Sequence, residues 1–431
     1  MHASGGVPAK HFQYEIIMSK PFEKVRILDF SQVVSGPFAT SLLTLMGAEV
    51  IKFERPPGGD ESRTFCASKE LLDLGMGSAF LALNAGKQSL SLDLKNPEAI
   101  GIVKKMIATA DVIIENYRPG VMARLGLGYE AVKVIKPDII YCSISGYGQE
   151  GPDRDAPAYD GAVQAAAGVM SITGYPEHEP VRVGFPFADA STGQAAALAI
   201  AGALYRKLAT GQGQYIDIAM TDATLAMMTQ IVAFTSVAGV VPGRIGNLAW
   251  SRRPTSDMFR ARDQALCLVV NSEAHYAKLF KAIGREDVLA DPRFADWDAR
   301  TRNVAELRAI IEGAFATNTA EYWEAHLRAA GVAAARVKDI GQALASPQLA
   351  TRNLLLTVPG PKGLDRPVTI MNAPFLCNED GPGTDRPAPN IGEHNEAALQ
   401  ALGYSAEEIA AARAAGVFWQ PPPRPSAAPK T

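Results

Sequence analysis

The sequence predicts an α/β protein, in which a large domain built on a mainly parallel sheet is followed by a smaller α+β domain. Its length, the alternation of strand and helix patterns in its first half, and the loss of that alternation in its second half indicate this. The chain has 431 residues, of which 47% are hydrophobic and 20% are charged, as is typical of folded proteins. At about 100–200 residues per domain, this length accommodates two or three domains.

Six apolar segments in the first half have the pattern of buried or half-buried strands. Predicted helices lie between these strands at Phe38–Met46, Pro97–Ala110 and Ala190–Leu208, and the first of them ends before Gly47. Another helix, from Asp222, follows the last strand. Strands separated by helices of this length form βαβ units, so their sheet is mainly parallel. The predicted strands are Val25–Phe30, Glu49–Glu54, Gln88–Leu94, Asp111–Asn116, Ile139–Ser145 and Gln214–Met220.

The second half of the chain follows a different pattern. Residues 243–263 are rich in Gly, Arg, Pro and Ser, which is typical of a linker. Two short strands, Leu266–Val270 and Val332–Val337, enclose three predicted helices and form the smaller unit. A last helix begins at Ser405, whose spacing to Glu408 is that of a capping box. The three enclosed helices are His275–Ile283, Val304–Phe315 and Thr319–Ala330.

These patterns divide the chain into six consecutive segments. Met18 stands before Ser-Lys-Pro-Phe, close to the first predicted strand, so residues 1–17 are interpreted as an extension upstream of the natural start. Proline-rich stretches mark the segments after the small domain. The segments are an N-terminal extension (1–24), a large domain (25–242), a linker (243–263), a small α+β domain (264–345), a C-terminal segment (346–419) and a flexible tail (420–431).

Charge and cysteine content restrict the partners and the compartment. With 42 basic and 45 acidic residues the formal net charge is −3, so no global field attracts nucleic acid or an anionic membrane. The longest apolar run, Ala195–Leu204, has about half the length of a membrane span. The widely spaced cysteines predict a reducing compartment and therefore a cytoplasmic protein. These cysteines are Cys66, Cys142, Cys267 and Cys377.

The common cofactor motifs do not occur in a usable context. Gly146–Gly151 matches GxGxxG after a predicted strand, but Pro152 and charged residues follow in place of a helix, so no helix N-terminus is available for a pyrophosphate. Gly86-Lys87-Gln88-Ser89 has only the end of a phosphate-binding loop. The six histidines are isolated, so the sequence predicts no metal site. We expect no permanently bound cofactor.

Several segments, in order along the chain, resemble one family. They include FSQVVSGP (30–37), GAEVIKFERPPGGD (47–60), NAGKQSLSLDLK (84–95), DVIIENYRPG (111–120), SGYGQEGP (145–152), FADASTG (187–193), TGQGQYIDIAM (210–220), DPRF (291–294) and IGEH (391–394). Together they resemble the class III CoA-transferases, the CaiB/BaiF group that includes formyl-CoA transferase and carnitine CoA-transferase. The resemblance extends from residue 24 to about residue 415.

This resemblance implies the fold, the assembly and the reactants. The large domain is expected to be Rossmann-like, the C-terminal segment to return to it, and two subunits to form an interlocked homodimer. The implied reaction moves CoA from an acyl-CoA donor to a free carboxylic acid, so CoA is a cosubstrate. This chain has Val34 where formyl-CoA transferase has a glutamine. The apolar side chains of Val34 and Trp250 favour a substrate bulkier than formate or oxalate.

The resemblance makes Asp189 the catalytic residue. We expect it just ahead of the helix Ala190–Leu208, where unpaired N–H groups favour negative charge and keep the carboxylate ionised. An ionised carboxylate can attack a thioester to give a mixed anhydride, from which CoA forms an aspartyl thioester. From local sequence alone, a helix N-cap is the favoured role for Asp189, and the resemblance to the family reverses this preference.

Further site residues follow from the same resemblance. Arg55 corresponds to a position that lies near the adenine of CoA in the family. A guanidinium suits this position, because it can stack on a base and bind phosphate. Tyr159 and Asp160 are expected to support the active site. The residues expected to bind CoA are Val33, Val34, Ser35, Arg55, Leu92, Lys95, Asn116 and Arg124.

Two alternatives to CoA transfer are open. An α-methylacyl-CoA racemase has the same fold and uses a histidine and an aspartate as its acid–base pair. Tyr159 stands where that histidine would be, and an ordinary tyrosine, titrating near about pH 10, is a poor base at neutral pH. A non-catalytic CoA-binding homologue is the other alternative, against which the presence of Asp189 and the CoA positions argues.

Overall fold

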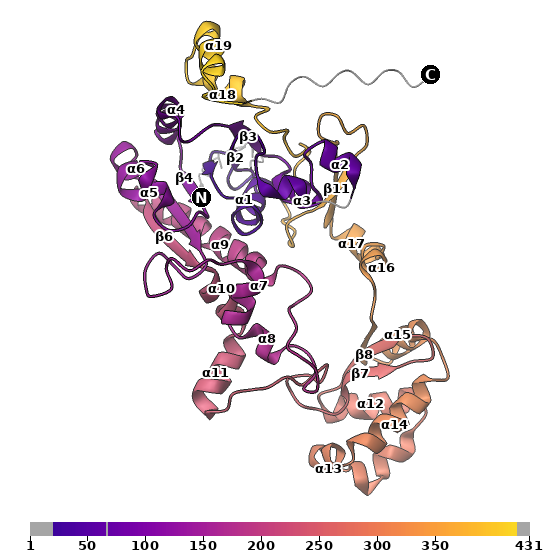
Figure 1. The fold of residues 1–431 in the computed structure, drawn as a ribbon. Coiled ribbons are helices and arrows are strands. Elements are labelled where there is room, and N and C mark those ends of the chain that lie inside the picture. The colour runs from indigo at the N-terminus through magenta and orange to yellow at the C-terminus, as the bar shows by residue number, and fades with distance from the viewer. Residues whose placement is uncertain (1–19, 66–67, 420–431) are drawn as a thin grey trace, which may run out of the picture. The chain divides into compact units, whose positions relative to one another are not determined.

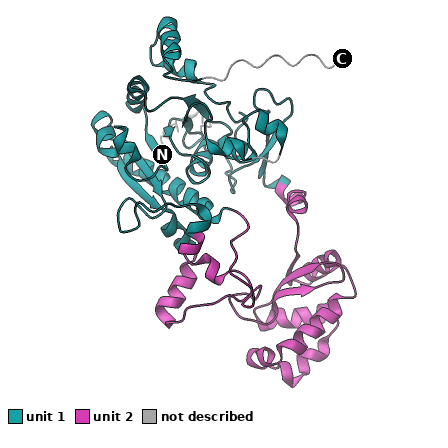
Figure 2. Ribbon diagram, in the orientation of Figure 1, with its two compact units in different colours: residues 1–163, 186–227, 350–431 teal, residues 164–185, 228–349 magenta. Residues whose placement is uncertain are grey.

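The fold is described from a computed structural model that covers residues 20–65 and 68–419 (Figure 1). Most of the predicted N-terminal extension, together with Cys66 and the predicted tail, lies outside these residues. The chain forms two compact units (Figure 2). The described parts of 1–163, 186–227 and 350–431 make up the large unit, and residues 164–185 and 228–349 make up the small unit.

The large unit is built on a six-stranded sheet in which every pairing is parallel. Its strand order is β3-β2-β1-β4-β5-β6, so β1 and β4 are central neighbours. The predicted parallel sheet and the positions of its six strands are confirmed. The strands are β1 (Arg26–Asp29), β2 (Glu49–Glu54), β3 (Gln88–Ser91), β4 (Val112–Glu115), β5 (Ile140–Ser145) and β6 (Gln214–Ala219).

Both faces of this sheet are buried, which explains why the strands are apolar at successive positions. Ile27 faces a core shared with α1 (Ser35–Leu45) and α9 (Phe187–Thr210). The next residue, Leu28, faces the opposite core, which contains side chains of α4 (Pro97–Ile107). The other helices of this unit are α2 (Lys69–Asp73), α3 (Ser78–Asn84), α5 (Val121–Arg124), α6 (Tyr129–Ile135) and α10 (Met220–Met227).

The C-terminal part of the chain packs on the large unit. Helices α18 (Asn395–Ala401) and α19 (Ala406–Ala414) contribute to the core on the α4 side, and Phe418 bridges to Leu92. The predicted capping box is present, with Ser405 and Glu408 bonding reciprocally. Before these helices, where the sequence predicts irregular structure, β10 (Leu355–Val358) and β11 (Val368–Met371) form an antiparallel pair.

The small unit contains an antiparallel sheet in the order β7-β8-β9, made of Ser256–Arg260, Ala265–Val269 and Ala333–Arg336. Strand β7 lies inside the segment predicted to be a linker, because Phe259 anchors it in the core of this unit. The helices are α8 (Val169–Ile172), α11 (Thr229–Ala238), α12 (Glu273–Ala282), α13 (Trp297–Arg302), α14 (Val304–Phe315), α15 (Ala320–Ala329) and α16 (Ile340–Leu344), while α7 (Asp160–Ala166) and α17 (Pro347–Thr351) cross between units. Within the described ranges, no helix is both long and apolar enough to cross a membrane.

Helices α1 and α9 approach each other closely where α9 carries a glycine. A Cβ atom on Gly193 would lie 2.7 Å from the carbonyl oxygen of Ser35 and 2.9 Å from Cδ1 of Phe38. Both distances are shorter than a normal van der Waals contact, and the nearer one is to backbone. Gly193 therefore sets how close the start of α1 lies to the start of α9.

We expect Gly193→Ala to destabilise the protein by about 1–3 kcal/mol, because the added methyl group overpacks the α1–α9 contact. Gly101→Ala, in the middle of α4, is the matched control, since its Cβ would meet nothing within 4 Å. The control should gain about 0.5–1 kcal/mol from helix propensity. Urea unfolding measures both, and equal effects of the two substitutions would contradict the packing argument.

Candidate active site

The loop between β1 and α1 is held residue by residue. The carbonyl of Ser31 accepts a hydrogen bond from Lys52 Nζ at 2.7 Å. Asn116, directly after β4, bonds both backbone groups of Gln32, each at 2.8 Å. The Val33 N–H donates to the carboxylate of Asp60, at 3.1 Å to Oδ1 and 3.3 Å to Oδ2. Three consecutive residues are thus fixed from three different side chains.

Val33 adopts a conformation that its side chain disfavours. Its φ is 66°, in the left-handed region. A β-branched residue there is a genuine outlier, and such strain persists only where the surroundings over-determine it. Two residues later Ser35 begins α1, and it is buried. The strained turn therefore decides where the Ser35 hydroxyl and N–H point.

Asp189 lies in the first turn of α9, opposite Ser35. The prediction that it precedes the helix is wrong, because α9 begins at Phe187 with Pro186 at the N-cap position. The early start is stabilised by Asp160, whose Oδ1 accepts hydrogen bonds from the N–H of Ala188 at 2.8 Å and of Asp189 at 3.3 Å. Since Pro186 supplies no side-chain cap, Asp160 acts as the capping group. Asp189 is not the N-cap residue.

The electrostatic expectation for Asp189 is also corrected. Burial and the charge of Asp160 raise the pKa of Asp189 from 3.8 to about 6, although hydrogen bonds from the hydroxyl and N–H of Ser35 act in the opposite direction. The helix N-terminus does not keep the pKa low, because Asp160 already occupies the N–H groups there. Asp189 is therefore half-buried and basic for an aspartate, yet still mostly ionised at neutral pH.

A buried network of charged residues lies beneath the loop. It contains three ion pairs: Lys52–Asp60 at 2.8 Å, Arg63–Glu54 at 2.6 Å and Lys87–Asp29 at 3.3 Å. Lys52 and its hydrogen bonds hold the pKa of Asp60 down at about 2 despite burial, which keeps that carboxylate charged. Asp29 also accepts from the Ser31 N–H at 2.9 Å. The network therefore touches the loop through several of its members.

A second carboxyl group near the loop titrates close to neutrality. Burial raises the pKa of Glu115, the residue before Asn116, to about 7. Its side chain accepts a hydrogen bond from the Tyr117 N–H at 2.9 Å. Glu115 lines a hollow of about 440 Å³ whose other lining residues include Arg118, Tyr129, Tyr141, Ser143, Gln149 and Tyr215. Glu115 must be distinguished from Asp189 in any pH profile of this enzyme.

The predicted CoA-binding residues fall into two groups. Val33, Val34, Ser35 and Asn116 gather at the β1–α1 loop beside Asp189. Arg55 follows β2, Lys95 lies between β3 and α4, and Arg124 ends α5, all three with exposed side chains. Because carboxyl ends of parallel strands share one edge, these cations lie toward the same edge of the sheet. Leu92 is different, being 2% exposed within the core. Tyr159 is 74% exposed.

Sequence reasoning missed Asp60, Lys52 and the strain at Val33. One signal was available: Lys52 and Glu54 interrupt an otherwise apolar strand that must be buried on both faces, which demands charged partners. The positive φ of Val33 leaves no trace in the sequence, because valine is not a residue that this conformation selects.

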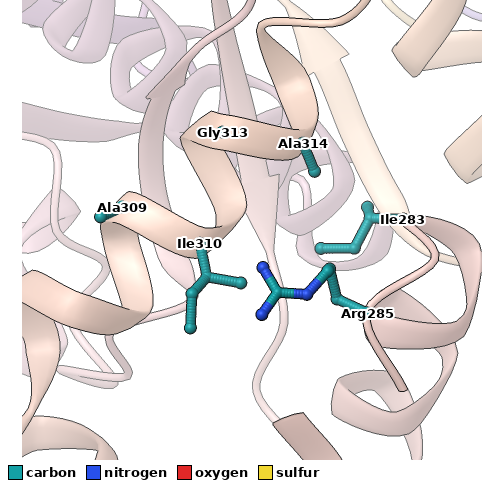
Figure 3. A pocket seen from close by; sticks show the side chains of 6 residues that line it. All are labelled: Ile283, Arg285, Ala309, Ile310, Gly313 and Ala314. Atoms are coloured by element: carbon teal, nitrogen blue, oxygen red, sulfur yellow. The ribbon is translucent and has the colours of Figure 1, made fainter. Parts of the chain in front are cut away.

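A further hollow, of about 440 Å³, occurs in the small unit between Ile283 and α14 (Figure 3). Figure 3 shows the Arg285 side chain extending toward Ile310 across its mouth. The guanidinium of Arg285 is already bonded to Asp287 at 2.8 and 2.7 Å. The other residues that line this hollow are Ala309, Gly313 and Ala314, whose side chains carry no reactive or charged group.

Comparison with known proteins agrees with the geometry. The sequence pattern of CoA-transferase family III matches residues 22–395. The chain is 36% identical over 378 residues to acetyl-CoA:oxalate CoA-transferase of Acetobacter aceti, covering 88% of this chain and 94% of that protein. It is 34% identical over 390 residues to succinate–glutarate CoA-transferase of Agrobacterium fabrum, covering 89% and 96%.

The solved structures give the same result. A CaiB/BaiF family protein from Brucella suis superposes with a TM-score of 0.79 at 30% identity, covering 89% of this chain and all of that one. Fold and sequence together define a transferase that acts on CoA thioesters. The chain belongs to CoA-transferase family III, as the sequence resemblance indicates.

Asp189→Asn should stabilise the protein at pH 7.5 by up to about 3 kcal/mol. The carboxyl pKa is about 6 when folded against an ordinary 3.8, so ionisation above pH 6 favours unfolding. The gain should shrink as the pH falls from 6 toward 3.8, where the wild-type side chain becomes protonated in the folded state. Urea unfolding at pH 7.5 and pH 5 measures this.

Asp222→Asn is the control for this experiment, because Asp222 is exposed in the first turn of α10. Removing its charge should cost a few tenths of a kcal/mol through the helix dipole, roughly equally at both pH values. A loss of stability in Asp189→Asn at pH 7.5 would contradict the raised pKa.

Proposed function

We propose that the protein moves CoA from an acyl-CoA to a short dicarboxylic acid through covalent intermediates on Asp189. The observation that carries the proposal is the carboxylate itself, which is half-buried in the first turn of α9, with the start of α1 packed close to that helix. Aspartate attacks thioesters only when it is ionised and poorly solvated, and this environment supplies both conditions. The family membership gives the reaction class.

The proposed reaction proceeds in four balanced steps. The Asp189 carboxylate attacks the donor thioester, forming an acyl-aspartyl anhydride and releasing CoA thiolate. The thiolate attacks the Asp189 carbonyl, giving an aspartyl-CoA thioester and the free donor acid. The acceptor carboxylate attacks that thioester, forming a second anhydride and again releasing CoA thiolate. The thiolate then attacks the acceptor carbonyl, releasing the new acyl-CoA and restoring the Asp189 carboxylate.

The pKa of Asp189 suits both directions of this exchange. At pH 7 a carboxyl group with a pKa of about 6 is mostly ionised, so the nucleophile is available. It is also more basic than an exposed aspartate, which strengthens its attack on a carbonyl. The N–H and hydroxyl of Ser35 orient it.

The CoA-binding roles are proposed for the residues predicted from the sequence. Arg55, Lys95 and Arg124 are exposed cations suited to the phosphates and the adenine, while Val33, Val34, Ser35 and Asn116 lie beside the nucleophile, where the pantetheine thiol must arrive. Leu92 would shape this surface from the core. Asp160 supports the site by capping α9, and Tyr159 presents an exposed ring directly before it.

The acceptor is proposed by analogy with the relatives. The names of two of them specify oxalate and glutarate, which are both dicarboxylates. Val34 in the β1–α1 loop is apolar, which favours an acid longer than oxalate. A panel of acyl-CoA donors against C2–C6 mono- and dicarboxylates, read by mass spectrometry, would identify the pair.

A homodimer is also proposed. Helix α9 exposes Leu198, Tyr205 and Leu208, at 75%, 75% and 86% respectively, on the helix that carries the nucleophile. Apolar side chains gathered on one helix indicate an interface. We expect light scattering to give a dimer at micromolar and nanomolar concentration, and a stable active monomer would contradict this. A cytoplasmic location is proposed because the three described cysteines are unpaired.

Incubation with the acyl-CoA donor should leave a hydroxylamine-sensitive adduct on the peptide that contains Asp189. Asp189→Asn has nearly the same shape but no anionic nucleophile, so transfer should fall by about 10³-fold or more. Asp222→Asn is again the matched control and should form the adduct at the wild-type rate. Normal turnover by Asp189→Asn would refute the mechanism.

Exchange of the proton on the α-carbon distinguishes CoA transfer from racemisation, because only a racemase removes this proton. A racemase needs two acid–base groups on opposite sides of that carbon, and Tyr159 stands where the histidine of a racemase would be. With a 2-methylacyl-CoA in heavy water, we expect no α-deuterium in the recovered thioester while CoA transfer to an added acid proceeds. Deuterium incorporation that is lost in Asp189→Asn would assign the protein to the racemases.

A further inference from the structure

The Lys52–Asp60 ion pair contacts the β1–α1 loop at Ser31 and at the strained residue, Val33. Lys52 Nζ donates to the carbonyl of Ser31, and Asp60 accepts from the N–H of Val33. The two side chains meet at 2.8 Å, and both are fully buried. The pair therefore spans the loop as a single rigid link from β2 to residues 31 and 33.

Stability alone does not account for this pair. Taking two charges out of water costs several kcal/mol each, and replacing a buried pair by apolar residues is often neutral. Val33 meanwhile keeps a conformation that is unfavourable by about 1–3 kcal/mol for a non-glycine residue. A buried pair that contributes little to stability and holds an unfavourable turn in place is better explained by what the turn positions.

What the turn positions is the start of α1. From Val33 the chain passes Val34 at the N-cap position to Ser35. The hydroxyl and the N–H of Ser35 act on the Asp189 carboxylate and lower its pKa. The two helices are close there, because a Cβ atom on Gly193, one turn after Asp189, would lie 2.7 Å from the Ser35 carbonyl oxygen. Asn116 adds a third hold on the loop at Gln32 and also donates to the Ser35 hydroxyl at 3.4 Å. The route from Asp60 to the nucleophile thus runs through three consecutive residues, Val33, Val34 and Ser35.

We propose that Lys52 and Asp60 are positioning residues for the nucleophile: they hold Val33 in its left-handed conformation and thereby direct the hydroxyl and N–H of Ser35 at the Asp189 carboxylate. This inference rests on the proposed role of Asp189. When the link is removed, Val33 relaxes, Ser35 turns away, and the carboxylate loses the hydrogen bonds that favour its ionised form. Asp160 of α7, the charged group that acts on Asp189, still disfavours ionisation.

The test is the pH dependence of adduct formation in a single turnover. Asp60→Leu with Lys52→Met removes both charges together, so neither is left buried without a partner, and it also removes the acceptor of the Val33 N–H. The rate of adduct formation should fall at low pH as Asp189 becomes protonated, and we call this fall the acid limb. We expect the acid limb to move to higher pH by at least about half a unit, because the ionised carboxylate has lost hydrogen bonds. The rate at pH 7 and saturating acyl-CoA should fall by about tenfold.

A matched control separates positioning from general loosening. Lys207→Met breaks the contacts of Lys207 with Asp111 and Asp138, at 2.9 and 3.0 Å, near the opposite ends of the strands. Like Lys52→Met, it replaces a paired lysine in the large unit, but it touches no part of the β1–α1 loop. Its acid limb should coincide with the wild type even if its unfolding midpoint falls. Equal shifts in the two variants would overturn the proposal.

Two further variants keep the proposal testable if the double variant fails to fold. Asn116→Ala releases Gln32 without altering a buried charge and should shift the limb in the same direction. Ser35→Ala removes the hydroxyl directly, and in its background the Asp60 and Lys52 substitutions should add less than they do alone. An unshifted limb in Asn116→Ala, or full additivity with Ser35→Ala, would contradict the inference.

Failure of the proposed function would look different. If no adduct forms on wild-type Asp189, the covalent mechanism is wrong and no acid limb can be measured. If the adduct forms normally and its limb is the same in all variants, only the positioning role is wrong. Titration of Glu115, whose pKa is about 7, is distinguished from titration of Asp189 by measuring the same pH profile with the single variant Glu115→Gln. This substitution should leave the acid limb near pH 6 in place.

Discussion

The hydrogen bond from the Val33 N–H to Asp60 is the contact on which the geometry of the site depends. It holds a β-branched residue at a φ of 66° in the turn that leads into α1. Asp60 can accept this bond while fully buried because Lys52 compensates its charge. The sheet contributes by placing Lys52 on β2, next to β1, so that the link crosses between neighbouring strands. The parallel fold, the buried charges and the strained turn are thus parts of one arrangement.

The pKa of Asp189, the proposed nucleophile, is set by competition between its two neighbours. Ser35 favours the ionised carboxylate of Asp189, whereas Asp160 and burial disfavour it, and the balance lies near pH 6. Asp160 is placed there because it caps α9 at the N–H groups of residues 188 and 189. The capping interaction that stabilises the helix is therefore also the interaction that makes Asp189 more basic. An apolar cap could not do both.

The sequence predicts the framework better than the chemistry within it. The six strands follow from apolar segments separated by helices, and the Ser405 capping box from its spacing. The start of α9 could not be placed, because its cap, Asp160, is distant in sequence and Pro186 carries no capping group. For the same reason the pKa of Asp189 was expected to be low. Lys52 and Glu54 could have indicated a buried network, but their partners are fixed only by the folded chain.

The most direct test of this account follows oxygen atoms through Asp189. The acceptor acid is supplied with ¹⁸O in its carboxylate, and the enzyme is digested after turnover. The anhydride steps leave one acceptor oxygen on Asp189, so its peptide should gain about 2 Da, and on the next cycle this label should appear in the released donor acid. CoA transfer that leaves both Asp189 and the released donor acid unlabelled would contradict the covalent role of Asp189.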